Sequence, residues 1–395
     1  MSRGVIAPLA MFGSACLVPD TSNLIRCSEG DCTGGAPGSG GGIAITCTDT
    51  VEAFPEIPGL SFDTSSAEDA VRRDLQVRDT RLLALAADPE KRWRPVLVDF
   101  ATMSVENALE KPGVEDGNLR AIALGSDGRF YSASPAKLWK TTGADNVFGV
   151  DPQGLSGLTA LFIDPSNEHI LFLARESGAT QTEIVRVDTE LTAPPMELVA
   201  TLAGQPAVPM TLVPPIASEP ARIAVRMRER VTTCVFDGAA CATPKVFQAP
   251  ASGEPWAIGA AAWAPNETTG LLDIVIAEQL TETASKDDTS SGRLAWFLAE
   301  GDAAPVLPNV LWRARAVSVM PSVAPEIAFS AEVSTATGSI PVIARCPLRD
   351  TIPPDLTGCS CVAGPERATV IANDPKTQTF YFQSGTTLYR WPSPP

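Results

Sequence analysis

The sequence lacks three features that would point directly to an activity. Its one histidine, His169, lies in a turn-like run at 165–169 without a Gly-x-Ser-x-Gly motif, which favours a surface residue over a catalytic one and excludes multi-histidine metal sites. No apolar run reaches the ~18 residues of a membrane-spanning helix. Basic residues are too few for nucleic acid, because 30 Lys and Arg face 46 Asp and Glu and the net charge of −16 repels phosphate backbones.

The C-terminal stretch is the clearest structural pattern that is present. Three runs there are rich in β-branched and aromatic residues, which fit a pleated sheet. These runs cover residues 368–372, 379–383 and 386–391. Asp374-Pro375 ends the first run, because proline cannot donate to a sheet ladder, and Ser384-Gly385 supplies the second turn. A lone three-stranded unit cannot bury both faces, so we expect similar units beside it.

Looser copies of this strand–turn–strand pattern recur upstream. The first turns of the copies fall at Asp79, Asp127, Asp164, Ser218, Asn266, Ala324 and Asp374. Their spacing ranges from 37 residues (Asp127 to Asp164) to 58 (Asn266 to Ala324). Propeller repeats occupy ~40–50 residues per four-stranded blade, so the pattern is typical of a β-propeller, although no Trp-Asp repeat or kelch double glycine is present.

We therefore predict an all-β fold in which residues 43–395 form one β-propeller domain with seven blades, or six if the earliest copy is not a blade. The last copy has only three strands, so we expect an N-terminal strand to complete it, with 43–47 as the candidate. An irregular all-β sandwich is the alternative fold. For the earliest copy, a helix that begins at the capping-box pattern of Ser65 and runs to Asp88 competes with the first blade.

Residues 1–16 have the layout of an export signal. Arg3 precedes an apolar run at 5–12, and the small residues 13–15 precede Cys16. This segment resembles a bacterial lipoprotein signal, and the resemblance implies that Cys16 is lipidated and becomes the mature N-terminus. Simple secretion with cleavage near Ala15, or a cytoplasmic N-terminus that happens to be apolar, are the alternatives. We thus expect an exported protein, either an outer-membrane or periplasmic lipoprotein or a secreted one.

Two segments are predicted to connect rather than to form blades. Residues 17–42 contain few large apolar side chains and end in a glycine-rich run, which indicates a flexible tether. A phosphate-binding loop is excluded there, because no Lys-Ser/Thr pair follows the glycines. The polar run 281–292 is predicted to be a solvated loop inserted between two strands of one blade, with ligand binding as the alternative.

The cysteines fit an oxidising compartment. If Cys16 is lipidated, eight remain as disulfide candidates: Cys27, Cys32, Cys47, Cys234, Cys241, Cys346, Cys359 and Cys361. Cys234 and Cys241 flank a turn and are predicted to form a hairpin disulfide. Three cysteines then remain towards each end, so at least one bond must join the two groups if all are oxidised. Zinc at Cys27/Cys32 or Cys359/Cys361 is disfavoured, because the spacings are not CxxC.

These observations define a scaffold but not an activity. Our first hypothesis is an exported, monomeric, non-enzymatic propeller that binds a protein or glycan ligand on one face, needs no cofactor or metal, and contacts a membrane only through its lipid anchor. A carbohydrate-active hydrolase or lyase that uses carboxylates in the propeller channel is the alternative, and a purely structural lipoprotein is the second. The run 126–131 resembles the Asp-box of sialidases only in part and is better explained as an Asp-Gly hairpin turn.

The tryptophans give one further expectation. There are seven, and most fall inside predicted strands, so we expect them in the core between sheets. One or two could instead line a sugar-binding face. The set comprises Trp93, Trp139, Trp256, Trp263, Trp296, Trp312 and Trp391.

Overall fold

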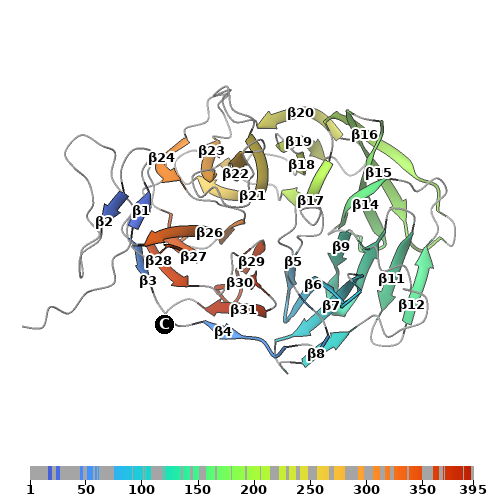
Figure 1. Ribbon diagram of the computed structural model, residues 1–395. Helices are drawn as coiled ribbons and strands as arrows, with labels where there is room; N and C mark the ends of the chain where they lie inside the picture. The colour runs from blue at the N-terminus through green and yellow to red at the C-terminus, as the bar shows by residue number, and fades with distance from the viewer. Residues whose placement is uncertain are drawn as a thin grey trace, which may run out of the picture.

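In the part of the chain that the computed structural model describes, the regular elements are almost all β-strands, arranged as sheets around a common centre (Figure 1). It describes residues 17–19, 24–26, 45–47, 51–56, 58–59, 61, 75–90, 92–100, 102, 104–107, 119, 121–134, 137–142, 146–150, 157–164, 167–178, 180–191, 194–204, 206–213, 222–227, 231–236, 241–247, 256–266, 271–280, 292–297, 306–311, 316–320, 324–335, 338–348, 359–363, 368, 370–385 and 387–392. The predicted signal with Cys16 lies outside these residues, and so do residues 281–291 of the predicted insertion at 281–292.

Three antiparallel four-stranded sheets come first. Sheet 1 contains β5 (Leu75–Arg78), β6 (Arg81–Ala87), β7 (Trp93–Asp99) and β8 (Ser104–Asn107). Sheet 2 contains β9 (Ala121–Leu124), β10 (Phe130–Ala133), β11 (Leu138–Thr142) and β12 (Asn146–Val150), with a 3-10 turn at Ser126–Gly128. Sheet 3 contains β13 (Leu158–Ile163), β14 (Ile170–Glu176), β15 (Gln181–Asp188) and β16 (Glu197–Ala203).

Two further sheets repeat the same meander. Sheet 4 contains β17 (Pro206–Val213), β18 (Arg222–Met227), β19 (Val231–Phe236) and β20 (Cys241–Phe247). Sheet 5 contains β21 (Trp256–Asn266), β22 (Leu271–Leu280), β23 (Gly292–Phe297) and β24 (Val306–Leu311). In each of sheets 1 to 5 the chain passes from one strand to its hydrogen-bonded neighbour, so local hairpins build these sheets.

The last two sheets each recruit a strand from the N-terminal part of the chain. Sheet 6 contains β25 (Val317–Met320), β26 (Glu326–Thr335), β27 (Gly338–Pro347) and β28 (Cys359–Ala363), with β3 (Ile45–Cys47) as a parallel fifth strand. Sheet 7 contains β29 (Val370–Asp374), β30 (Thr379–Ser384) and β31 (Thr387–Pro392), and β4 (Glu52–Ala53) pairs with β31. The strand predicted at 43–47 is therefore in sheet 6, and the expectation that it completes the last sheet is wrong.

The apolar core lies between neighbouring sheets. The first strands β9, β13 and β25 are buried along their whole length, because each is covered by a sheet on either side. One cluster joins sheets 2 and 3 around Tyr131 and Leu171, and another joins sheets 3 and 4 around Phe172 and Ile223. Phe54 packs with residues of sheets 1 and 7 in a cluster that joins the first sheet to the last. The first strands of these two sheets, β5 and β29, are also in contact.

Amide side chains connect first strands whose edges face the centre. Gln76 of β5 donates through Nε2 to the carbonyl of Ile122 (2.8 Å), and its Oε1 accepts from the amide of Leu124 (2.8 Å). Asn373 of β29 likewise donates to the carbonyl of Val319 in β25 (3.0 Å). Each amide thus satisfies backbone groups of a neighbouring strand edge, groups that are costly to leave unpaired when buried.

Several predicted turns have the expected backbone conformation. Asp79 has φ of 54° between β5 and β6, and Gly128 has φ of 70° between β9 and β10, a region that glycine adopts without strain. The strands on either side of Asp79 also show that the alternative of a helix up to Asp88 is wrong for its described part. The predicted tether at 17–42 contains one described feature, the antiparallel pair β1 (Leu17–Pro19) and β2 (Leu24–Arg26).

Candidate functional site

The turns between the first and second strands of sheets 1 to 3 meet at one end of these sheets, which we call the first-turn face. Glu168, in the turn before β14, connects three consecutive sheets there. Its carboxylate accepts from the amide (3.0 Å) and the hydroxyl (2.7 Å) of Ser126 in the sheet 2 turn, and from Arg78 Nη2 at the end of β5 (2.7 Å). We call Arg78, Ser126 and Glu168 the Glu168 cluster. It fixes the relative positions of turns that are 42 or more residues apart in the sequence.

The Glu168 carboxylate is held in its ionised form. Burial raises its pKa, but hydrogen bonds from Ser126 and the nearby Arg78 and Arg129 guanidinium groups outweigh that effect, so the pKa of Glu168 lies below its usual value. The Arg81 guanidinium lies over the neighbouring turn, where a Cβ at Gly128 would be 1.7 Å from its Nη1. The hydrogen bonds and ion pair of the Glu168 cluster therefore tie this end of sheets 1 to 3 into one polar surface.

His169 lies on the same face, in the turn where the sequence places it. Its side chain is one-third exposed. Nε2 lies 3.3 Å from Oε1 of Glu190, and Nδ1 lies 3.4 Å from Nζ of Lys140. Ser126 donates its hydroxyl directly to Glu168 and not to the imidazole. The described contacts of Ser126, Glu168 and His169 therefore do not form a Ser-His-acid relay, in which the imidazole must lie between the hydroxyl and the acid.

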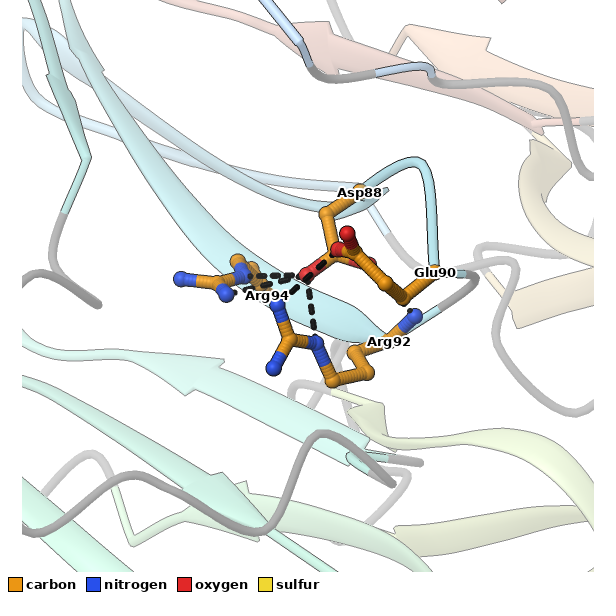
Figure 2. A network of polar contacts seen from close by, with 4 residues as sticks. All are labelled: Asp88, Glu90, Arg92 and Arg94. Atoms are coloured by element: carbon orange, nitrogen blue, oxygen red, sulfur yellow. Dashed lines mark hydrogen bonds and ion pairs between the residues drawn. The ribbon is translucent and has the colours of Figure 1, made fainter.

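The opposite end of sheet 1 carries a second polar network, in the turn between β6 and β7 (Figure 2). Asp88, which is buried, accepts from the amide (2.8 Å) and Nε (2.7 Å) of Arg92 and from Nε (3.0 Å) and Nη2 (2.9 Å) of Arg94. Burial raises the pKa of Asp88, but these hydrogen bonds bring it below its ordinary value. Glu90 pairs with Arg92 at 3.0 Å. Every donor in this network comes from the turn or from β7, so it stabilises the hairpin.

The seven first strands supply few groups for catalysis. Among the residues of these described strands, the only carboxylate is Asp374, at the end of β29. It accepts from the amide of Lys376 (3.0 Å) and the hydroxyl of Thr377 (2.6 Å), so it organises its own turn. A glycosidase needs two facing carboxyl groups about 5–10 Å apart. The described first strands do not provide such a pair.

Three of the predicted core tryptophans are where the sequence places them. Trp93, Trp139 and Trp391 are each 3% exposed and belong to clusters between neighbouring sheets. They are therefore unavailable to stack on a sugar. Trp263 is half-buried, and the side chains of the other three lie outside the described ones.

Four cysteines whose side chains are described are oxidised. Cys346 of β27 is bonded to Cys359 of β28, with Cα atoms 4.1 Å apart. Cys234 and Cys361 are also disulfide-bonded, but only the Cys346–Cys359 bond joins two described side chains. Both sulfurs of the Cys359-x-Cys361 pair are thus committed to disulfides and are not thiolate ligands for zinc. The predicted Cys234–Cys241 bond stays a prediction.

A buried guanidinium that the sequence does not reveal joins the last two sheets. Arg345 of β27 is 3% exposed and pairs with Glu326 of β26. Its Nη1 donates to the backbone carbonyls of Trp391 (3.4 Å) and Pro392 (3.0 Å) in β31. The partners of Arg345 are up to 47 residues away in the sequence, so no local sequence motif predicts these contacts.

The described residues offer neither a metal site nor a membrane-spanning helix. No group of three or more His, Cys, Asp and Glu side chains among them is placed to hold a metal ion. None of their helical segments is long and apolar enough to cross a membrane.

Comparison with known proteins defines the fold class. No family model and no curated protein matches the chain. Among solved structures, the chain is similar to the WD40 domain of Neurospora crassa Pan2, with a TM-score of 0.54 and 11% identity over 89% of this chain and 98% of that domain. The protein therefore has an all-β propeller fold, and the sandwich alternative is set aside.

A second solved structure supports the same fold. A chain in the crystal structure of the mitotic checkpoint complex matches with a TM-score of 0.57 and 12% identity, over 91% of this chain and 97% of that one. At such low identities the likeness shows the fold alone, because propellers carry many unrelated functions.

Proposed function

We propose that this protein is an exported, non-enzymatic β-propeller that acts as a rigid binding scaffold at the cell envelope and binds a protein or glycan ligand on its first-turn face. The Glu168 cluster carries the proposal, because it locks the turns of three sheets into one surface without assembling a catalytic relay. A preorganised surface binds with little loss of conformational freedom.

The ring geometry that we propose has seven blades, one for each of sheets 1 to 7. Support comes from the contact between β5 and β29 and from the shared core around Phe54. The pairing of β4 with β31 would supply the fourth strand of the last blade. In this arrangement the N-terminal segment closes the ring, but through residues 52–53 rather than 43–47.

Export is supported by the oxidised cysteines, since disulfides persist mainly outside the cytoplasm. Intact-mass analysis of the native protein, extracted separately from membrane and soluble fractions, tests it. We expect a diacylglycerol adduct on Cys16 and loss of residues 1–15. An unmodified, full-length chain with reduced cysteines would refute export.

Site-specific photocrosslinking in the native host tests the binding face. A photoreactive residue at Asp79, exposed on the first-turn face, is compared with one at Glu90, exposed at the opposite end of the same sheet. We expect a discrete adduct from position 79 and none from position 90. Adducts from position 90 alone would move the ligand to the other face. The absence of adducts from both positions, in a lipidated protein, would favour the purely structural alternative.

A further inference from the structure

The Cys-x-Cys pair of β28 has a spacing that neither a local disulfide nor a zinc site explains. Cys359 and Cys361 are two residues apart in one strand, so their side chains leave the same face of sheet 6. Both are buried, at 1% and 0% exposure. A strand inside a sheet has one neighbour on each side, and two cysteines on one face can therefore each bond to a different neighbour.

Cys359 is bonded to β27, the neighbouring strand on one side of β28. The register of β27 and β28 pairs Arg345 with Ser360 and Ala344 with Cys361, and Cys346 is bonded to Cys359. The β27 residue opposite Cys361 is thus an alanine, which offers no sulfur. Cys361 is nevertheless disulfide-bonded, so its partner must come from elsewhere.

The other neighbour of β28 is β3. These two strands are parallel, and their register makes Cys47 the Cα partner of Cys361, while Cys359 faces Ile45. Neighbouring strands lie about 4.7–4.9 Å apart, within the ~4.4–6.8 Å between Cα atoms that a disulfide requires. Cys234 lies in sheet 4 and Cys241 begins β20 of that sheet, so neither is adjacent to β28.

We propose that Cys47 and Cys361 form a disulfide that fastens β3 to the outer edge of sheet 6. The bond forms by thiol–disulfide exchange with a protein disulfide donor of the exporting compartment. Each thiol loses its proton, the two sulfurs become bonded, and the donor disulfide takes up the two electrons and is released as two thiols. With Cys346–Cys359, this produces a covalent ladder across β27, β28 and β3.

The consequence concerns how the N-terminal segment is held. β4 is only two residues long, so its pairing with β31 contributes few ladder hydrogen bonds. A covalent bond at Cys47, five residues before Glu52, keeps this short strand near its partner even when the pairing opens. The inference stands whether or not the first-turn face binds a ligand. It is thus separable from the proposed function.

Thiol counting in paired variants tests the bond. Cys361→Ser and Cys47→Ser should each expose one alkylatable thiol in the denatured, unreduced protein, on the other residue of the pair. Cys32→Ser is the matched control, because it removes a neighbouring N-terminal cysteine and should leave Cys361 unlabelled. Cys361 that stays oxidised in Cys47→Ser, or becomes free in Cys32→Ser, overturns the proposal.

Peptide mapping of the unaltered protein keeps the test independent of variant folding. Combined trypsin and Glu-C digestion without reduction should release a linked species that contains residues 30–52 and 350–366, together with 346–349, which the Cys346–Cys359 bond retains. Fragment ions that break the backbone between Cys32 and Cys47 must place the bond on Cys47. Fragments that place it on Cys32, or a linked species that joins Cys361 to Cys27, would contradict the assignment.

Discussion

Arg345 is the most consequential single side chain between sheets 6 and 7. We predict that Arg345→Met strongly destabilises the protein. The substitution removes a guanidinium that pairs with Glu326 and donates to two carbonyls at the end of β31. It also removes a cation that lies 5.1 Å from the ring centroid of Phe380 and 5.7 Å from that of Trp391. Methionine fills a similar volume, so the substitution leaves little empty space and the free-energy cost of a cavity stays small.

The expected loss of stability depends on the Glu326 charge, which stays in place without its partner. Removing one partner of a buried ion pair costs about 3–5 kcal/mol, because the remaining charge keeps its desolvation penalty without compensation. Glu326 is itself partly exposed, at 22%, so water relieves part of this and the lower half of that range is expected. At about 2.1 cal/mol/K per residue and about 350 folded residues, 3 kcal/mol lowers the melting temperature by about 4 °C.

Equilibrium urea unfolding at pH 7 and calorimetry measure the effect. The matched control is Arg186→Met, which makes the same substitution at an exposed pair with Glu197, where the side chains are 32% and 61% exposed. Exposed pairs contribute about 0–1 kcal/mol, so the control should change stability little. Equal destabilisation by the two variants would refute the reasoning that burial makes the Arg345 contacts valuable.

Three further predictions concern turns and bonds. The pKa of Glu168 is depressed in the folded protein, so its stabilising contribution is present above about pH 4.3 and is lost as the pH falls through the folded pKa. The urea midpoints of the wild type and of Glu168→Gln should therefore converge on acidification. A gap between the two midpoints that stays constant with pH would contradict this. Gly128→Ala and Gly178→Ala should each destabilise by about 1–2 kcal/mol, because both glycines have positive φ and the Arg81 guanidinium that a Cβ at 128 would meet is the end of a flexible side chain and can move aside; a clearly larger loss for Gly128→Ala in chemical unfolding would contradict this. Replacing Cys346 and Cys359 together by Ala should cost about 3 kcal/mol in the same assay, as expected for a short closed loop, and no change would argue against the bond.

The repeat could be predicted from the sequence because its turns are encoded locally. An aspartate or asparagine followed by proline or glycine restricts the backbone wherever it occurs, and β-branched runs on either side fit a sheet. Asp127-Gly128 and Asp374-Pro375 thus marked real first turns, which lie between β9 and β10 and between β29 and β30. Asp79, which is followed by a threonine, lies in the first turn between β5 and β6. The period between these turns, rather than any signature motif, indicated the propeller.

The N-terminal strands could not be assigned in the same way. β3 and β4 contain three and two residues, too few to show an alternation of apolar and polar positions. Residues 43–47 have the stronger β pattern, so local reasoning chose them for the last sheet. Position relative to the ring decides instead, because β28 and β31 each offer one open edge and the chain meets them in sequence order.

The Glu168 cluster was missed for a related reason. Glu168 and Ser126 are ordinary turn residues in isolation, and only the radial arrangement brings them within hydrogen-bonding distance. His169 drew attention because it is the sole histidine, yet its neighbour Glu168 makes the structurally important contacts. Polar links between repeats join positions of equivalent register, so an alignment of the predicted turns would have been the one signal able to suggest them.

The acidity of the protein also has a partly local explanation, which bears on where a ligand would bind. Asp88, Asp99, Asp188 and Asp374 each accept a hydrogen bond from a backbone amide two to four residues ahead, as Asx-type turns do. These carboxylates are selected by turn geometry and would be present in a propeller with any partner. Recognition of the proposed ligand would therefore depend on side chains that the turns do not use. The exposed Leu191, beside the His169–Glu190 pair on the first-turn face, is such a residue. We expect contacts with a partner to be centred there, because an exposed apolar side chain on a rigid rim gains free energy only when something covers it.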